Sequence, residues 1–357
     1  MPTAVTTPTL FPSLTRDALL AFQFSSWYSR FSSLSIKSTI IRPLSQEFRE
    51  YLDSDGVFVP DGAEDVPLES TLSDDGNNED DNEEEEDPRR QFAFPEIDTK
   101  IRDAVALYGA VFPKLNFSSP RDAAWILPAS SPLKCTVPAD VYLLLKSSDF
   151  VQHDISPEHV FDGCEDDVTS DDGARSDSYE LELVLRKWYP VDRGRELRCF
   201  VRQEVLLGIS QRDPNHYDFW NEPEIQRKVL EAVKAYWEVN IKGRWEQTGG
   251  NYTFDFLLTR DLSKGHIVDF NPYAPRTDPL LFTYEELHER LLEHASTPQE
   301  PELRVVDSPS HPAATRNAPA HQHNMVPLEA LAMSSGRNVE DFADLLREEI
   351  KKTMDDD

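Results

Sequence analysis

The chain has 357 residues, enough for one large or two ordinary domains, and its 39% hydrophobic and 10% aromatic content can form a real core. Its 36 basic and 66 acidic residues give a formal net charge of −30, which excludes a protein that wraps nucleic acid but still allows a local basic pocket. Because the cysteines (Cys135, Cys164, Cys199) show no C-x-x-C spacing and no stretch reaches the ~18 apolar residues of a membrane span, we expect a soluble, cytoplasmic protein with no structural zinc and no membrane partner.

Ordered elements are expected from residue 22 onward. The aromatic-rich stretch 22–31 leads into a strand over 35–41, which is rich in β-branched residues. Residues 97–110 predict a helix, and an apolar run over 141–146 predicts a short buried strand. The apolar stripe of the predicted helix consists of Ile97, Ile101, Val105 and Leu107.

Three polar stretches interrupt this pattern. Residues 74–87 are almost all acidic or Asn and repel one another, so they form either a solvated linker or an interaction tract for a basic partner. Residues 162–178 make a shorter polar loop. Residues 297–323, rich in Pro, Ala, His and Asn, are expected to be disordered.

The second half of the chain predicts strands joined in hairpins. Residues 179–188 alternate between apolar and charged side chains, as is typical of a strand. Strands over 196–201 and 205–210 turn at Gln203-Glu204, and strands over 252–258 and 267–271 turn through 261–265.

Two helices accompany these hairpins. Asn221, three residues before Glu224, predicts a cap for a helix that begins near Glu222. Its buried stripe would be Ile225, Val229, Val233, Tyr236 and Trp237. Thr283, three residues before Glu286, predicts a second cap. Helices mixed with antiparallel hairpins indicate an α+β fold.

The hairpin over 252–271 carries the most informative polar residues. Residue 262 is midway between Asp255 and Asp269, so a symmetric hairpin sets these carboxylates opposite each other, with Asn271 on the same face. Two carboxylates and an amide oxygen among apolar residues suit a hard divalent cation that also touches phosphate. The alternative is three exposed polar positions on a half-wet sheet.

An anionic ligand also needs cations. The candidates are Lys114, Lys146, Arg186, Lys187, Arg198 and Arg212. Each alone reads as a surface residue at the end of an apolar segment, but several in one acidic chain favour a phosphate clamp that works with Mg²⁺. Glu196 shares a strand face with Arg198 and could simply pair with it. No Walker or Gly-x-Gly-x-x-Gly pattern occurs.

The wording of several of these segments closely resembles the cell division cycle protein 123 family. The resemblance covers about residues 22–290, resumes weakly over 326–351, and rests on seven motifs in order. They are FSSWYSRF (24–31) with SIKS (35–38), VFPKLN (111–116), LLLKSSDF (143–150), LVLRKW (183–188), ELRCF (196–200), GISQRD (208–213) and VDFNP (268–272).

The resemblance implies an ATP-grasp fold in which two α+β lobes enclose ATP and Mg²⁺. It implies metal ligands at Asp255, Asp269 and Asn271, and gives Lys146 no role. Nucleotide contacts are implied at Lys114, Phe117, Ser119, Arg121, Lys187, Trp188, Tyr189, Glu196, Arg198, Arg212, Asp255 and Asp269. The backbone of residues 187–189 is expected to form an exposed strand edge that contacts the adenine.

The same resemblance implies a domain order. Residues 1–73 would form the N-terminal part of the ATP-grasp-like domain and 92–296 its core, separated by an acidic disordered loop at 74–91. A disordered linker at 297–325 would precede a partner-docking segment at 326–357, where Val339, Phe342, Leu345 and Ile350 could form an amphipathic helix.

For function, the resemblance implies an assembly chaperone. It would bind the gamma subunit of eukaryotic translation initiation factor 2 and promote assembly of the trimeric factor, thereby supporting translation initiation, cell cycle progression and cell division. The alternative is an ATP-grasp ligase or nucleotidyltransferase acting on a protein or RNA acceptor. ATP-grasp enzymes usually cover the phosphates with a glycine-rich loop. The loop at 162–178 is acidic instead, which argues against ligase activity.

Overall fold

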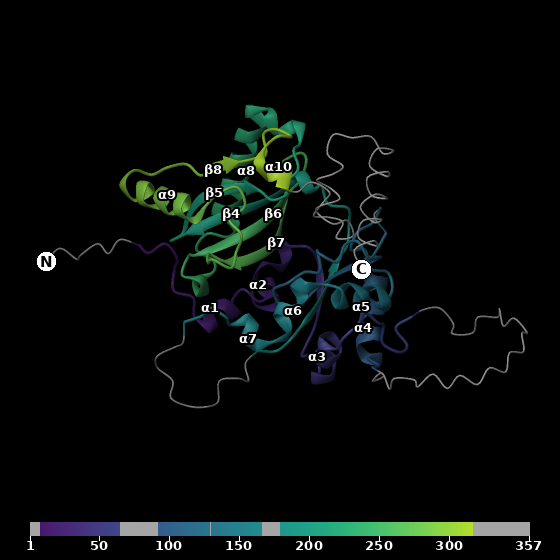
Figure 1. Ribbon diagram of the computed structural model, residues 1–357. Coiled ribbons are helices and arrows are strands. Elements are labelled where there is room, and N and C mark those ends of the chain that lie inside the picture. The colour runs from purple at the N-terminus through teal and green to yellow at the C-terminus, as the bar shows by residue number, and fades with distance from the viewer. Residues whose placement is uncertain (1–7, 65–91, 129, 166–178, 317–357) are drawn as a thin grey trace, which may run out of the picture.

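The computed structural model describes residues 8–64, 92–128, 130–165 and 179–316. These residues form two β-sheets, each packed with helices, that lie next to each other (Figure 1). The acidic tract 74–87, most of the loop 162–178 and the segment 326–357 fall outside the described residues. No described helix is long and apolar enough to span a membrane.

The smaller sheet has three antiparallel strands, and we call this half the small-sheet lobe. Its order is β1 (Ser38–Ile41), β3 (Leu183–Lys187) and β2 (Val111–Lys114), with β3 in the centre. The accompanying helices are α3 (Gln46–Asp53), α4 (Pro95–Tyr108), α5 (Pro138–Lys146), α6 (Asp149–Ile155) and α7 (Pro157–Val160). Leu183 and Leu185 of β3 enter their common core.

The larger sheet has five strands, and we call this half the large-sheet lobe. Its order is β7 (Gly265–Pro272), β6 (Tyr252–Leu258), β4 (Glu196–Arg202), β5 (Val205–Gln211) and β8 (Glu302–Arg304). All neighbours are antiparallel except β5 and β8. The helices of this half are α2 (Phe24–Phe31), α8 (Pro223–Asn240), α9 (Tyr284–Ser296) and α10 (Pro312–Arg316). Helix α1 (Arg16–Leu20) packs through Leu19 against Val160 of α7. The 3-10 turns of the described residues are η1 (Ser32–Leu34), η2 (Arg193–Arg195), η3 (Asp218–Asn221) and η4 (Glu246–Thr248).

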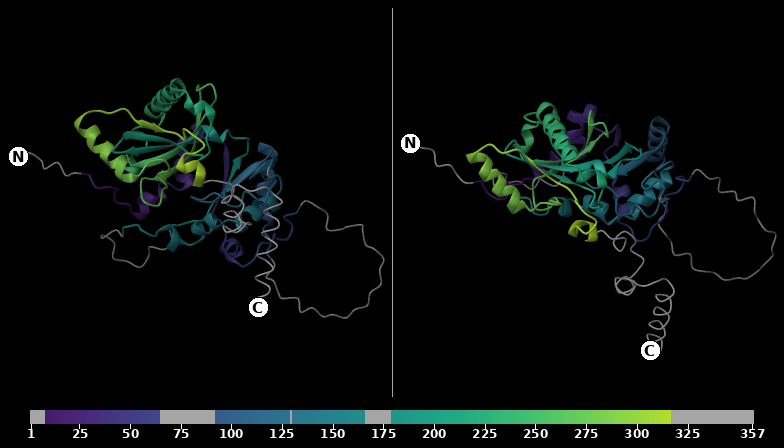
Figure 2. Two further views of the ribbon diagram at one scale, coloured as in Figure 1. Left: turned by 45° about the horizontal axis from the view of Figure 1, so that its top comes forward. Right: turned by 90° about the horizontal axis from the view of Figure 1, so that it is seen from above.

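The two faces of the large sheet differ in chemistry. Because side chains alternate along a strand, Leu197, Cys199 and Val201 of β4 share the face that α2 and α8 cover with aromatic and aliphatic side chains. The opposite face, toward α9, carries Phe200 but also Glu196, Arg198 and Arg202. The helices α8 and α9 lie on opposite sides of the sheet (Figure 2). The charged residues of β4 therefore lie on the α9 face of the large sheet.

The hairpin of β6 and β7 has the predicted register. Asp255 pairs with Asp269, and Thr253 pairs with Asn271. A bulge follows, so that Phe256 pairs with Ile267 and the turn is shortened by one residue. Since the bulge lies between the carboxylate pair and the turn, it leaves the two aspartates opposite each other.

The predicted α+β class and the two hairpins at 203–204 and 259–264 are confirmed, but four local predictions are wrong. Residues 141–146 lie in helix α5, which begins at Pro138 and whose Asp140 carboxylate accepts hydrogen bonds from the N–H groups of Thr136 and Val137. An apolar run of six residues cannot distinguish a buried strand from a helix. In α4, Leu107 is exposed, and Ala104 takes its place in the core.

The other two corrections concern a cap and a strand. Glu222, and not Asn221, is the residue before α8, and its side chain makes no capping hydrogen bond. The stretch 297–325, expected to be disordered, contains β8, which pairs with β5 in parallel. A three-residue strand next to prolines has no periodicity to detect, because its partner is distant in the sequence.

The predicted cap of α9 is a complete capping box. The Thr283 hydroxyl accepts a hydrogen bond from the Glu286 N–H at 3.2 Å, and the Glu286 carboxylate accepts one from the Thr283 N–H at 2.7 Å. We expect Thr283→Ala to lower the free energy of unfolding by about 1 kcal/mol, measured by urea denaturation. Thr297→Ala, at the other end of α9, is the control and should change it less; equal effects would contradict the capping role.

Candidate functional site

A cavity of about 300 Å³ lies between the two sheets. Its small-sheet side is formed by the end of β3 and the segment that follows, together with residues near 112, 119–121 and 130–133. Its large-sheet side is formed by charged residues of β4, β6 and β7 and by Arg212. The cavity therefore collects residues from both halves of the chain.

Asp255 is buried and bound by two arginines. Arg198 donates to both carboxylate oxygens, from Nε at 2.8 Å and from Nη2 at 2.9 Å, and Arg212 Nε lies 3.1 Å from Oδ2. Burial lowers the pKa of Arg198, but the paired Asp255 carboxylate outweighs this effect and raises the pKa overall. The bidentate geometry fixes the orientation of Asp255.

Asp269 is held by the fully buried Lys114. The Lys114 ammonium lies 2.9 Å from Asp269 Oδ2 and also donates to the Phe117 carbonyl. Lys114 comes from β2 of the small-sheet lobe and Asp269 from β7 of the large-sheet lobe. This ion pair therefore bridges the two lobes at the edge of the cavity.

Glu196 is a third acidic group on the cavity wall. Arg212 Nη1 donates to its carboxylate at 2.7 Å, and the half-exposed Arg121 lies 3.9 Å away. Burial raises the pKa of Glu196, and Arg121 opposes that rise. Arg212 thus bridges Glu196 and Asp255 and orders the acidic side of the cavity.

Arg186 is a buried cation at the cavity whose guanidinium has unused hydrogen-bond donors. Its side chain is 2% exposed, and its Nε and Nη2 atoms have no hydrogen-bond partner among the described residues. The guanidinium lies 5.4 Å from the Phe24 ring centroid. Burial lowers the pKa of Arg186, and Asp269 opposes that effect. A buried cation with unused donors at a cavity is what an anionic ligand would satisfy.

The lining also includes apolar side chains from both sheets and the loops beside them. Among these are Ile36, Phe112, Leu133, Val191, Leu257 and Val268. A cavity that combines apolar side chains with convergent charged groups fits a ligand with an aromatic part and an anionic part.

Most of the predicted nucleotide contacts meet at this cavity. Nine of them line it: Ser119, Arg121, Lys187, Trp188, Tyr189, Glu196, Arg212, Asp255 and Asp269. Lys114 and Arg198 bind the two aspartates instead, and Phe117 contributes its carbonyl to Lys114. Asn271, the third predicted metal ligand, lies two residue pairs further along the hairpin, opposite Thr253.

In the segment 187–189, expected to contact adenine through its backbone, the N–H groups of the first two residues already have partners. The Lys187 N–H donates to the Lys37 carbonyl, and the Trp188 N–H donates to the Ala110 carbonyl. Both N–H groups are therefore used by the segments next to β1 and β2, which flank β3 on its two sides. Tyr189 is the first residue past this ladder, and it lines the cavity. Any backbone contact to a ligand from these N–H groups must therefore begin at Tyr189.

Two candidate cations that were given no site role from the sequence differ in the structure. Arg186, which received no specific role, lines the cavity, whereas Lys146 is far from it. The Lys146 ammonium bonds to the Leu52 carbonyl at 3.3 Å and to Ser54, and so fastens α5 to the end of α3. The only sequence signal for Arg186 was a cation at the end of an apolar strand, and Lys146 gives the same signal.

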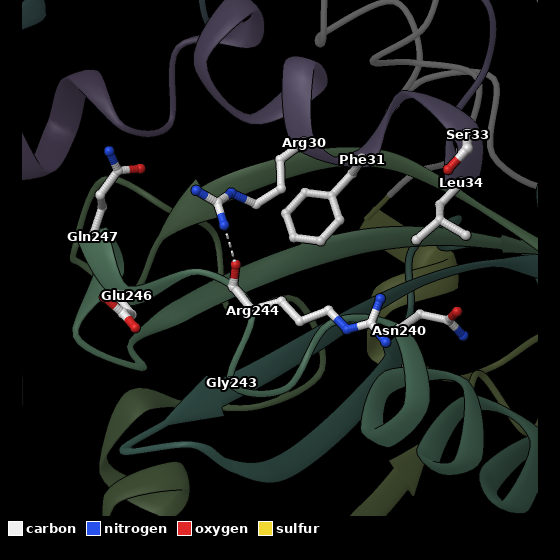
Figure 3. A pocket seen from close by; sticks show the side chains of 9 residues that line it. All are labelled: Arg30, Phe31, Ser33, Leu34, Asn240, Gly243, Arg244, Glu246 and Gln247. Carbon is white, nitrogen blue, oxygen red and sulfur yellow. Dashed lines mark hydrogen bonds between the residues drawn. The ribbon is translucent and has the colours of Figure 1, made fainter.

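A second, wider cavity of about 770 Å³ lies between the end of α2 with the turn that follows it and the segment 240–247 (Figure 3). Arg30, Phe31, Asn240 and Arg244 are among its lining residues, and Arg30 Nη1 donates to the Arg244 carbonyl at 2.6 Å. None of the predicted site residues lines it, so we place the candidate site between the sheets.

The chain is similar to known proteins along most of its length. It is 35% identical over 331 residues to the "Translation initiation factor eIF2 assembly protein" of Schizosaccharomyces pombe, covering 92% of this chain and 95% of that one. It is 38% identical over 280 residues to the protein of the same name from Xenopus tropicalis, covering 76% and 78%.

Structural similarity points the same way. The solved structure of Cdc123 from S. pombe matches with a TM-score of 0.61 and 32% identity, covering 83% of this chain and all of that one. The sequence model of the D123 family matches residues 27–334. The resemblance found from the seven motifs is thereby confirmed, and the chain belongs to the D123 family.

Proposed function

We propose that the cavity between the sheets binds ATP together with Mg²⁺, and that this chain uses it as an assembly chaperone for eIF2. The observation that carries the first half is the meeting of three groups: the opposed Asp255 and Asp269, and the unpartnered guanidinium of Arg186. Carboxylates and a buried cation side by side suit a metal-bound phosphate, which needs both.

The metal would be held by Asp255, Asp269 and Asn271. Within the described residues no group of three or more His, Cys, Asp or Glu side chains could hold a metal alone. Two carboxylates with an amide are an incomplete shell, and Mg²⁺ in such sites takes its remaining ligands from phosphate oxygens and water. The existing ion pairs with Arg198 and Lys114 hold both carboxylates in fixed orientations, as ligating carboxylates usually are held.

The nucleotide would use both sides of the cavity. Arg186, Lys187 and Arg212 would contact the phosphates, and the apolar residues Phe112 and Leu133 would contact the base; all five line the cavity. An ATP-grasp arrangement, in which two lobes enclose the nucleotide, is the architecture that the resemblance implies for this geometry. The direct test is calorimetry of the wild-type chain with ATP and Mg²⁺, in which no binding heat would overturn the proposal.

Arg186→Met separates binding from folding. The long apolar side chain of Met can fill the space without a buried, under-bonded charge, so we expect the free energy of unfolding to stay the same or to rise. Affinity for MgATP should fall roughly 10- to 100-fold, because the phosphate loses a charged donor in a site shielded from water. Urea denaturation and calorimetry measure the two effects. Unchanged affinity would remove Arg186 from the site.

The second half of the proposal is the partner. Relatives that align along most of this chain carry the name eIF2 assembly protein, and we extend that role to this chain, with the gamma subunit as the subunit that it binds. Pull-down of purified gamma subunit by the full chain should succeed. Assembly of the trimeric factor from separate subunits should be faster with the chain and ATP than with either alone. A clean failure of the pull-down would exclude the gamma subunit.

A ligase or nucleotidyltransferase finds little support in this geometry. Transfer of AMP to the protein needs a lysine free to attack, whereas the Lys114 ammonium is buried between Asp269 and the Phe117 carbonyl. Lys187 is exposed and lines the cavity, so it is the lysine that would be tested as an AMP acceptor. A mass increase of one AMP on the intact chain would revive this activity.

A further inference from the structure

The loop that carries four of the predicted nucleotide contacts is built around one tight turn. The Leu115 N–H donates to the Ser118 carbonyl at 2.9 Å, and the Arg121 N–H donates to the Ser119 carbonyl at 2.8 Å. The Asn116 side chain fastens the turn to the strand segment before β3, where its Oδ1 accepts from the Glu182 N–H at 2.9 Å. This loop leads from Lys114 to the cavity residues Ser119 and Arg121.

Asp154 of α6 binds the far side of that turn. Its Oδ2 accepts hydrogen bonds from the Phe117 N–H at 2.7 Å and the Ser118 N–H at 2.8 Å, and its Oδ1 accepts one from the Ser118 hydroxyl at 2.8 Å. The residue is fully buried, and burial raises the pKa of its carboxyl, whereas the Phe117 and Ser118 N–H groups oppose that rise. Within the described residues, the three hydrogen bonds of this carboxylate all go to one turn.

The same peptide unit connects Asp154 to the cavity. The Phe117 carbonyl, on the other side of the turn, accepts a hydrogen bond from the Lys114 ammonium, which in turn pairs with Asp269. A continuous series of contacts therefore runs from Asp154 through the turn and Lys114 to a proposed metal ligand. It begins in the small-sheet lobe and ends in the large-sheet lobe.

We propose that Asp154 is a positioning residue for the MgATP site, which fixes the turn from which Lys114 reaches Asp269. This inference rests on the proposed function. The Lys114 ammonium donates to the Phe117 carbonyl and to Asp269 at the same time, so the position of that carbonyl helps to set where the ammonium lies relative to Asp269. Without Asp154 the turn loses its anchor, Lys114 shifts, and both the Asp269 carboxylate and the loop bearing Ser119 and Arg121 are misplaced.

The test compares Asp154→Asn with two milder variants. Ser118→Ala removes one of the three hydrogen bonds and keeps the carboxylate. Tyr179→Phe removes the hydrogen bond from the Tyr179 hydroxyl to the Asp154 carbonyl, at 2.7 Å, and leaves the turn untouched. We expect Asp154→Asn to weaken MgATP binding roughly 10- to 100-fold, as is typical when a residue that orients a ligand is lost. Ser118→Ala should have a smaller effect, and Tyr179→Phe almost none.

A double-mutant cycle separates positioning from a general loss of structure. If Asp154 acts through Lys114, then Asp154→Asn should cost little further affinity in a Lys114→Met background, because the two effects are not additive for residues in one network. Hydrogen exchange of peptides covering residues 115–121 should be faster in Asp154→Asn than in Tyr179→Phe.

The outcomes are distinguishable. Additive effects on affinity in the cycle, or wild-type affinity in Asp154→Asn, would overturn the positioning role while the proposed function stands. Absence of MgATP binding by the wild-type chain would overturn both. Unfolding of Asp154→Asn would shift the test to Ser118→Ala with Lys114→Met, where additivity again counts against the role.

Discussion

Asp269→Ala should lose most of its affinity for MgATP, by roughly 10- to 100-fold in calorimetry, because a proposed metal ligand and the partner of Lys114 are removed together. The same change should destabilise the fold by ~3–5 kcal/mol, since the Lys114 side chain, 1% exposed, would be left as a buried charge without its carboxylate. Asp269→Asn keeps an oxygen for the ammonium and should destabilise the fold less while still weakening metal binding.

A matched control exists on the same hairpin. Asp261 lies in the turn between β6 and β7, where its carboxylate accepts hydrogen bonds from Thr259 and Ser263 and is exposed to water. Asp261→Ala removes a carboxylate from the hairpin at a distance from the cavity lining, so it should bind MgATP like the wild type. If Asp269→Ala also binds like the wild type, the aspartate pair is structural.

Arg198→Met should lower the free energy of unfolding by ~3–5 kcal/mol in urea denaturation. Arg198 neutralises Asp255 through two hydrogen bonds in a nearly dry environment, and it also donates to the Asp278 carbonyl at 2.9 Å. In the variant, Asp255 would keep only Arg212, which Glu196 also attracts. The charge would then be buried with about half of its present compensation.

The control for Arg198 is another arginine whose ion pairs are exposed to solvent. Arg227 on α8 contacts Glu224 and Glu231 at the surface, with geometry as good as that of Arg198. Water screens such pairs, so Arg227→Met should hardly change stability. Equal losses in the two variants would show that burial does not determine the contribution of these ion pairs.

The sequence predicts the acidic half of the site well because that half is local. Asp255 and Asp269 lie on one hairpin, and strand alternation with a centred turn is enough to set them opposite each other. The bulge after Asp255 could not be foreseen, but it shifts only the residues nearer the turn. Capping at Thr283 was equally readable, since its partner is three residues away.

The other half of the site depends on contacts that the sequence does not encode locally. Ile36, Phe112 and Leu133 come from three separate segments and meet only because β1 and β2 flank β3. Arg186 and Lys146 both follow apolar runs, and only the packed structure separates the cation at the cavity from the one that ties two helices together. Similarly, β8 exists because β5 offers it an edge.

The link between the two sheets has a mechanical consequence. β3 ends at Lys187 and β4 begins at Glu196, so the chain crosses from one sheet to the other within residues 188–195. Trp188, Tyr189, Pro190, Val191 and Arg193 of this crossing also line the cavity. Any rotation of one sheet against the other would bend this link and reshape the cavity wall. A molecule that fills the cavity would contact both sheets and restrict their relative rotation, and its release would allow that rotation again.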